Sequence, residues 1–104
     1  MFKKVKDATD KAHIILLAVH FDSERRHALG SRKIRVSKCK VVRIYDLDRN
    51  EIKDATLELY SPTHSKKQLY KLGMEIEVEC DLKWTEECVA GIHGFLSFDE
   101  AKEY

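Results

Sequence analysis

Apolar residues occupy both odd and even positions in the segment from His13 to Phe21 (HIILLAVHF). A strand that is covered on both faces has this pattern, whereas a strand with one solvated face alternates. The content of Ile, Leu and Val favours a strand over a short helix. We therefore expect a buried strand here, followed by a polar, basic connection over residues 22–32, which include Gly30.

The alternation from Lys33 to Tyr45 changes phase along the segment. Apolar residues take even positions up to Val36, odd positions at residues 39 and 41, and even positions again from Val42. A slip of one residue exchanges the two faces of a strand, so an unbroken strand would need a bulge or a bend. We expect that irregularity at Ser37 and Lys38.

A polar turn at residues 46–51 (DLDRNE) leads to a second run, in which Ala55, Leu57 and Leu59 are apolar. This pattern predicts a β-hairpin over residues 33–60. Residues 60–67 (YSPTHSKK) are expected to form a loop, because Pro62 cannot donate a hydrogen bond to a strand ladder.

The strongest alternation lies between residues 74 and 82 and predicts a strand with one buried and one acidic face. Downstream, the sequence Ser97-Phe98-Asp99-Glu100 is typical of a capping box that opens a short C-terminal helix. We expect an α+β fold: one β-rich domain of mostly antiparallel strands with this helix at its end. The alternating strand has Met74, Ile76, Val78, Cys80 and Leu82 on one face, and Glu75, Glu77, Glu79 and Asp81 on the other.

The length of 104 residues suffices for a single domain over residues 1–104 with one core. No run reaches the ~18 apolar residues of a membrane-spanning helix. Residues 1–12 have no secretory pattern and are expected to remain as a flexible or helical N-terminal extension. Three cysteines without a secretion signal predict reduced thiols and a cytoplasmic protein, in the host cell if the protein is viral.

The net charge of +1 hides an asymmetry between the two halves of the chain. Residues 1–45 contain twelve Lys or Arg and four Asp or Glu, whereas residues 46–104 contain seven and fourteen. Residues 25–43 contain eight basic residues and no acidic one. Two interpretations stay open: pairing with acids on later strands, or a surface that binds anions. A near-neutral domain lacks the basic field of most nucleic-acid binders, so we expect no nucleic-acid partner.

Candidate chemistry centres on His93, which lies between Gly91 and Gly94 and must find hydrogen-bond partners if it is buried. Cys88 could be a nucleophile activated by His93, but spacing alone does not establish this. A zinc site that combines Cys39, Cys80, Cys88 and His93 lacks the usual paired knuckles, so no metal or cofactor is expected. Trp84 is expected to cover an edge of the core, with base stacking as the alternative.

Three motifs lie in order along the chain. Residues 35–44 (RVSKCKVVRI) are similar to the segment R-x-S-K-A-K-V-L, Tyr60-Ser61 with residues 70–73 (YKLG) are similar to a tyrosine loop, and residues 84–104 fit the signature W-x-x-x-C-x-x-G-[IL]-H-x-F. These motifs resemble those of an uncharacterised domain of phage, giant-virus and bacterial proteins, often found beside pentapeptide repeats. The resemblance covers residues 33–104; it departs at Cys39, Pro62 and Gly94. It implies a viral or mobile-element origin and an accessory role, with no established activity.

Together these features predict a small non-enzymatic binding module of phage or viral type, which engages a host protein or a small phosphorylated, nucleotide-like ligand. Two alternatives stay open: an enzyme that acts on a nucleotide or glycosyl bond with His93 as general base, and a structural domain that self-associates into a homo-oligomer. No membrane partner is expected. The candidate ligand-binding residues are Arg35 and Lys38 for phosphate, Trp84 or Tyr60 for stacking, and His93 with Cys88 nearby.

Overall fold

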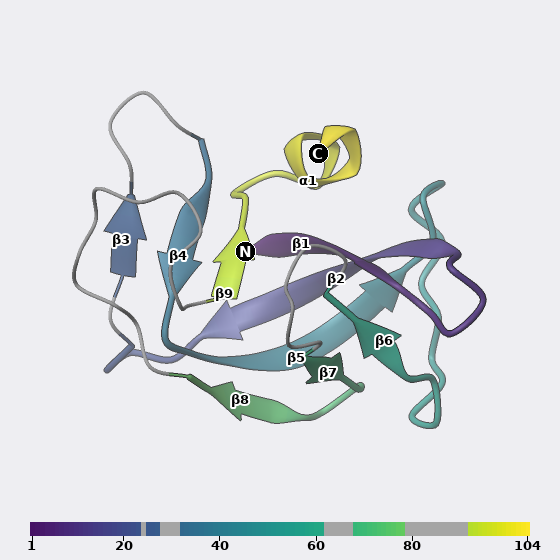
Figure 1. Ribbon diagram of the computed structural model, residues 1–104, viewed down its shortest axis with the longest axis horizontal. Helices are drawn as coiled ribbons and strands as arrows, with labels where there is room; N and C mark the ends of the chain where they lie inside the picture. The colour runs from purple at the N-terminus through teal and green to yellow at the C-terminus, as the bar shows by residue number, and fades with distance from the viewer. Residues whose placement is uncertain (24, 28–31, 62–67, 79–91) are drawn as a thin grey trace.

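The computed structural model describes residues 1–23, 25–27, 32–61, 68–78 and 92–104, which form two antiparallel sheets and one helix (Figure 1). The larger sheet has the strand order β7-β6-β1-β2-β5-β8, and the smaller has the order β3-β4-β9. This architecture confirms the predicted β-rich α+β class. The elements are β1 (Phe2–Lys6), β2 (Ala12–Val19), β3 (Arg25–His27), β4 (Ile34–Val36), β5 (Lys38–Tyr45), β6 (Leu59–Tyr60), β7 (Leu69–Tyr70), β8 (Glu75–Glu77), β9 (Ile92–Gly94) and α1 (Phe98–Glu103).

Strands of the two sheets close a ring around one core. β1 pairs with β2, and β2 pairs with β5. β4 runs directly into β5 and pairs with β9 (Figure 1). β9 returns to β1, because Phe2 and Phe95 exchange backbone hydrogen bonds of 2.6 and 2.7 Å. The main core is made of Val5, Ile15, Leu17, Val36, Cys39, Val41, Ile44, Leu59, Tyr70, Ile76 and Ile92.

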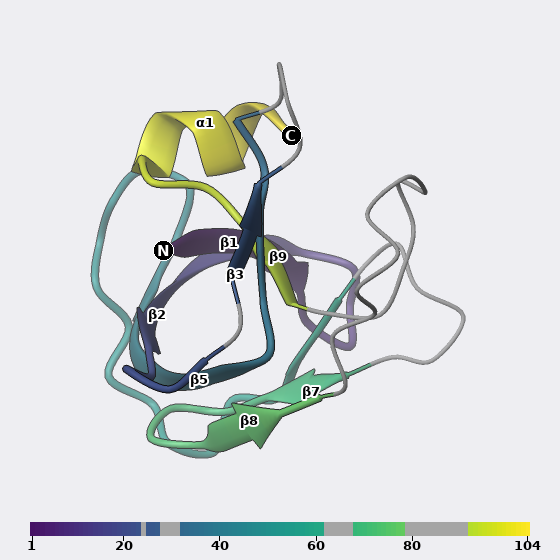
Figure 2. The same cartoon turned by 90° about the vertical axis from the view of Figure 1, so that its left-hand side faces the viewer.

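β2 is buried on both faces, as its sequence predicts. Ile15 and Leu17 belong to the main core, whereas Ile14 packs against Phe98 and Ala101 of α1 on the other face. Figure 2 shows α1 lying over this side of the sheet. The predicted capping box is confirmed, since the Oγ of Ser97 accepts a hydrogen bond of 3.1 Å from the amide of Glu100.

The expected irregularity at Ser37 is confirmed, because this residue separates β4 from β5 where the chain passes between sheets. The Oγ of Ser23 accepts hydrogen bonds from the amides of Ser37 and Lys38, both 3.1 Å long. The second phase change is a shift in register between β2 and β5 that leaves Val42 as the extra residue.

The predicted hairpin over residues 33–60 is wrong. Asp46 accepts hydrogen bonds from the amides of residues 48 and 50, and Asp54 accepts one from the amide of Thr56, so two successive aspartate turns interrupt the second strand. Only the bridge from Tyr45 to Glu51 remains of the pairing, with backbone hydrogen bonds from Ile52 to Ile44 and from Asp46 to Asn50. β6 pairs with β1 and β7 instead.

Residues 1–12 are not a flexible or helical extension. Residues 2–6 form β1, which lies between β6 and β2, and a turn at residues 7–11 joins it to β2. The reason is pairing, because β1 forms five register pairs with β2 and places Val5 in the main core. The described part of the chain contains no helix long and apolar enough to span a membrane.

The strand predicted over residues 74–82 is described only in part. Glu75 and Glu77 are exposed on either side of the buried Ile76 in β8, so the acidic face is confirmed at these positions. Residues 79–82 lie outside the described residues.

Candidate anion-binding site

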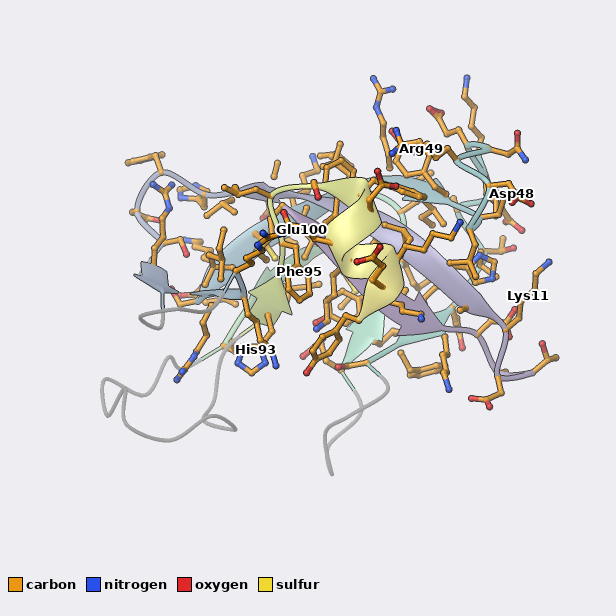
Figure 3. All side chains as sticks on the ribbon, turned by 90° about the horizontal axis from the view of Figure 1, so that it is seen from above. Lys11, Asp48, Arg49, His93, Phe95 and Glu100 are labelled. Carbon is orange, nitrogen blue, oxygen red and sulfur yellow. The ribbon has the colours of Figure 1, made fainter. Side chains whose placement is uncertain are left out.

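The smaller sheet brings Arg35 and His93 directly opposite each other. They are register partners in β4 and β9. The backbone N–H and C=O groups of Phe95 point toward β1. Those of His93, two residues earlier in the strand, point in the same direction and therefore away from β4. Arg35 and His93 are thus a pair without mutual backbone hydrogen bonds, whose side chains lie closest in antiparallel sheets, with Cα atoms roughly 4.5 Å apart. Figure 3 shows that His93 lies farther from α1 than Phe95 does.

Within the part of the chain that the structure describes, Arg35 is a buried cation without a compensating anion. Its side chain faces away from the main core, since its neighbour Val36 and the β9 residue Ile92 belong to that core. The residue is only 8% exposed, and its Nε and Nη1 have no hydrogen-bond partner. Nor does any carboxylate of the described residues lie within 4.0 Å of its guanidinium.

Two neighbouring arginines form ion pairs with acidic side chains. Arg32 lies 3.5 Å from Glu100, and Arg43 lies 3.4 Å from Glu51. These pairs agree with the interpretation that the basic and acidic halves of the chain pair within the fold. Arg35 has no such partner among the described residues, and its position on the smaller sheet places it opposite an imidazole.

Lys3 is a second buried cation beside β9. Its Nζ donates a hydrogen bond of 3.0 Å to the backbone oxygen of His93, at a point where β1 and β9 have diverged after the Phe2–Phe95 bridge. The ammonium of Lys3 therefore donates to this oxygen in place of the backbone amide that would do so in a continuous sheet. Burial lowers the pKa of Lys3 to about 8; the charge of Lys33 also lowers it, and Cys39 opposes the shift.

The other candidate residues of the described chain lie elsewhere. Lys38 follows the bend at Ser37 and pairs with Asp22 and Glu77 at 3.7 and 4.0 Å. Tyr60 lies in β6, and its hydroxyl donates a hydrogen bond of 3.0 Å to Glu58. Figure 1 places β6 and β4 on opposite sides of β9. The structure therefore joins Arg35 with His93, pairs Lys38 with acids instead, and places Tyr60 on the other side of β9.

Trp84 and Cys88 lie outside the described residues, as do Cys80 and Gly91. Cys39 belongs to the main core, and burial raises the pKa of its thiol to about 11. Within the described ranges no group of His, Cys, Asp and Glu side chains is arranged to hold a metal ion. Gly94 permits a close approach of the N-terminal residues, since a side chain there would meet the backbone oxygen of Phe2.

Lys3 is the residue that the sequence analysis missed. The alternation of side chains along the strand indicates that Lys3 is buried, because Met1, Lys3 and Val5 share one face and Val5 is apolar. A lysine between two apolar residues on a strand face indicates a buried amine that needs an acceptor.

Comparison with protein families matches the chain over residues 1–101 to a family described as "Family of unknown function (DUF5758)". The match includes β1 and β2, which precede the motifs of residues 33–104. No curated protein and no solved structure matches the chain. Because the match covers almost the whole sequence, this protein belongs to the family of unknown function DUF5758.

Proposed function

We propose that this protein is a small non-enzymatic binding module that captures a phosphorylated small molecule beside Arg35 and His93. The observation that carries the proposal is the buried guanidinium of Arg35, whose Nε and Nη1 have no partner. An isolated buried ion costs several kcal/mol in folding free energy. An anion bound at Arg35 would offset this cost. Part of the folding free energy that is lost to the unpaired charge would then be recovered as binding free energy.

Phosphate suits this pair of side chains. A guanidinium presents a planar fork of N–H donors that matches phosphate oxygens, and it stays charged at every physiological pH. The imidazole of His93 lies opposite Arg35, so a phosphate bound at the guanidinium would be beside it. We assign no stacking role to Tyr60 in this site, because it lies in β6, which Figure 1 places on the other side of β9 from β4.

The accessory role in a phage or virus, with a cytoplasmic location in the host, is part of this proposal. It is supported by the resemblance of the three motifs to a domain of phage and giant-virus proteins. Capture of a phosphorylated ligand would suit such a role, because a small binding protein can lower the free concentration of a host metabolite without any catalytic step.

The test compares the wild-type protein with Arg35→Met during chemical denaturation, with and without inorganic phosphate or pyrophosphate. Arg35→Met should leave the free energy of unfolding unchanged or raise it by about 1 to 3 kcal/mol, because it removes an uncompensated charge. Ligand should stabilise the wild type by about 2.7 kcal/mol at 100 times its Kd and should not stabilise the variant. Arg43→Met is the matched control, since Arg43 is exposed in β5 and paired with Glu51.

Native mass spectrometry with a nucleotide mixture would then identify the ligand. If neither phosphate nor any nucleotide binds at micromolar concentration, or if Arg35→Met responds like the wild type, the proposal is wrong. Turnover of a nucleotide that disappears in His93→Ala would favour the enzyme alternative instead.

A further inference from the structure

Two buried cations approach His93 from different strands. Arg35 is its register partner in β4, and Lys3 of β1 donates a hydrogen bond of 3.0 Å to its backbone oxygen. Lys3 is 6% exposed and Arg35 is 8% exposed. Among the described residues, no carboxylate lies within 4.0 Å of either cation. An anion beside His93 would therefore lie in the field of two positive charges that water screens only weakly.

The start of β1 keeps Lys3 in this place. Backbone hydrogen bonds between Phe2 and Phe95 hold β1 beside β9, and Gly94 has no side chain that would meet the backbone oxygen of Phe2. Lys3 follows directly after this bridge, on the face of β1 that carries Val5 of the main core. Its ammonium is therefore held against the backbone of β9 and not in solvent.

We propose that Lys3 is a specificity-determining residue of the anion site and makes it prefer dianions, such as the phosphate group of a monoester, to monoanions. This inference rests on the ligand capture proposed above. One negative charge compensates only one of the two cations, whereas a dianion compensates both. Lys3 acts through its field, because its ammonium is bound to the backbone of His93 and does not need to touch the ligand.

Proton binding at Lys3 should control this preference. Of the two cations only the lysine titrates near neutral pH, since a guanidinium stays charged. Burial lowers the pKa of Lys3 to about 8; the charge of Lys33 also lowers it, and Cys39 opposes the shift. Among the described residues, His93, whose backbone oxygen it binds, and the amino group of Met1 are the other titratable groups beside it. A bound dianion favours the charged form of Lys3, so by linkage the affinity for a dianion must fall as the pH rises through this range.

Isothermal titration calorimetry with methyl phosphate and methyl sulfate tests the preference. The two probes have similar shapes, but above pH 7 methyl phosphate carries nearly two negative charges and methyl sulfate carries one. Lys3→Gln removes the positive charge and keeps an N–H donor. Because Coulomb energy is proportional to charge, the loss of affinity for methyl phosphate should be the square of the loss for methyl sulfate. At a separation of roughly 10 Å and an effective dielectric constant of about 50, these losses are about tenfold and about threefold.

Lys4→Gln is the matched control. It removes the same charge from the other face of β1, where the ammonium of Lys4 donates to the backbone oxygen of Lys102 in α1. This variant should bind both probes like the wild type.

A pH series gives a second readout. The advantage of the wild type over Lys3→Gln in binding methyl phosphate should shrink from about tenfold at pH 7 to about twofold at pH 9. Met1 titrates in the same range but is present in both proteins. Lys3→Arg keeps its charge at pH 9 and should therefore keep its affinity across the series.

The outcomes separate this inference from the proposed function. A wild type that binds neither probe overturns both. If methyl phosphate binds but Lys3→Gln weakens both probes equally or not at all, the role of Lys3 is wrong and capture at Arg35 stands. Circular dichroism shows whether each variant is folded. If Lys3→Gln does not fold, the pH series decides: a wild-type affinity that does not fall between pH 7 and pH 9, or a Lys3→Arg affinity that falls equally, overturns the inference.

Discussion

The positions of Gly94 and Gly73 both require glycine, but for different physical reasons. Substitution of each by alanine should distinguish the two reasons. A Cβ at Gly94 would lie 2.7 Å from the backbone oxygen of Phe2, which is held by the Phe2–Phe95 bridge and cannot move aside. Gly94→Ala should therefore lower the free energy of unfolding by about 1 to 3 kcal/mol through overpacking. Urea denaturation measures this change.

Gly73→Ala is the comparison. Gly73 has a φ of 83°, but a Cβ there meets nothing within 4 Å. Its substitution should cost about 1 kcal/mol through backbone strain alone. Equal losses for the two variants would show that N-terminal packing does not constrain Gly94.

Lys3 should make stability depend on alkaline pH. Its pKa is about 8 in the folded state against an ordinary value of 10.5, so the unfolded chain binds more protons between these values. The free energy of unfolding should therefore rise with pH in this window, relative to Lys3→Met, which cannot titrate. Between pH 7 and pH 9 the difference between the two proteins should change by about 1 kcal/mol.

Urea titrations of both proteins at pH 7, 8 and 9 measure this difference. The raised pKa of the Cys39 thiol, about 11, acts in the opposite direction, and the charge of Lys3 lowers this pKa. Up to pH 9, however, the buried thiol stays protonated in both proteins, so its contribution is the same in both over this range. Parallel pH profiles would mean that the amine of Lys3 is not desolvated in the folded state.

At the scale of elements, Ser23 holds the bend between β4 and β5. Its Oγ is the acceptor for two backbone amides, those of Ser37 and Lys38. Ser23→Ala removes this acceptor and should lower the free energy of unfolding by about 1 to 3 kcal/mol. Chemical denaturation measures the loss.

Ser37→Ala is the control for the bend, because it leaves Ser23 as acceptor for the two amides and removes the contact of 3.4 Å between the two hydroxyl groups. We expect a smaller loss than for Ser23→Ala. A larger one would show that the hydroxyl of Ser37, and not that of Ser23, stabilises the passage between the sheets.

Two turns that follow strands are formed by the same short sequence pattern. In both the β1–β2 turn and the turn after β5, an aspartate accepts from the amides two and four residues later, and the residue three positions on has a φ near 67°. Figure 3 shows Lys11, Asp48 and Arg49 from these turns at the end of the molecule opposite to His93. The aspartates, Asp7 and Asp46, have lowered pKa values, chiefly because hydrogen bonds favour their charged forms.

At the scale of the whole molecule, the ring of strands should be the most stable unit. β2 lies between β1 and β5 and is covered on both faces, whereas β6 and β7 are two-residue strands at one side of the sheet. Native-state hydrogen exchange should show the slowest amides in β2 and β5 and faster exchange in β6 and β7. Equal protection of β7 and β2 would indicate that the whole sheet unfolds as one unit.

The fold was predictable where a local pattern is also the tertiary pattern. Apolar residues at both odd and even positions of residues 13–21 predicted the buried strand β2. The change of phase at Ser37 predicted the bend, and Ser97 with Glu100 predicted the helix cap. The hairpin failed because alternation in residues 55–59 does not specify a pairing partner. Arg35 and His93 were both chosen from the sequence, but their register across β4 and β9 links residues 58 positions apart and follows only from the fold.

By itself, the sequence determined the β-rich class, the positions of bends and caps, and the basic residues available for a site, because side-chain periodicity and turn chemistry act over a few neighbouring residues. Only the tertiary structure decided that residues 2–6 form an inner strand, that Lys3 replaces a backbone donor at β9, and that Arg35 is buried with no acid beside it among the described residues. The physical reason is that burial and charge compensation depend on which distant strands become neighbours, and closing the ring through Phe2 and Phe95 settles that choice.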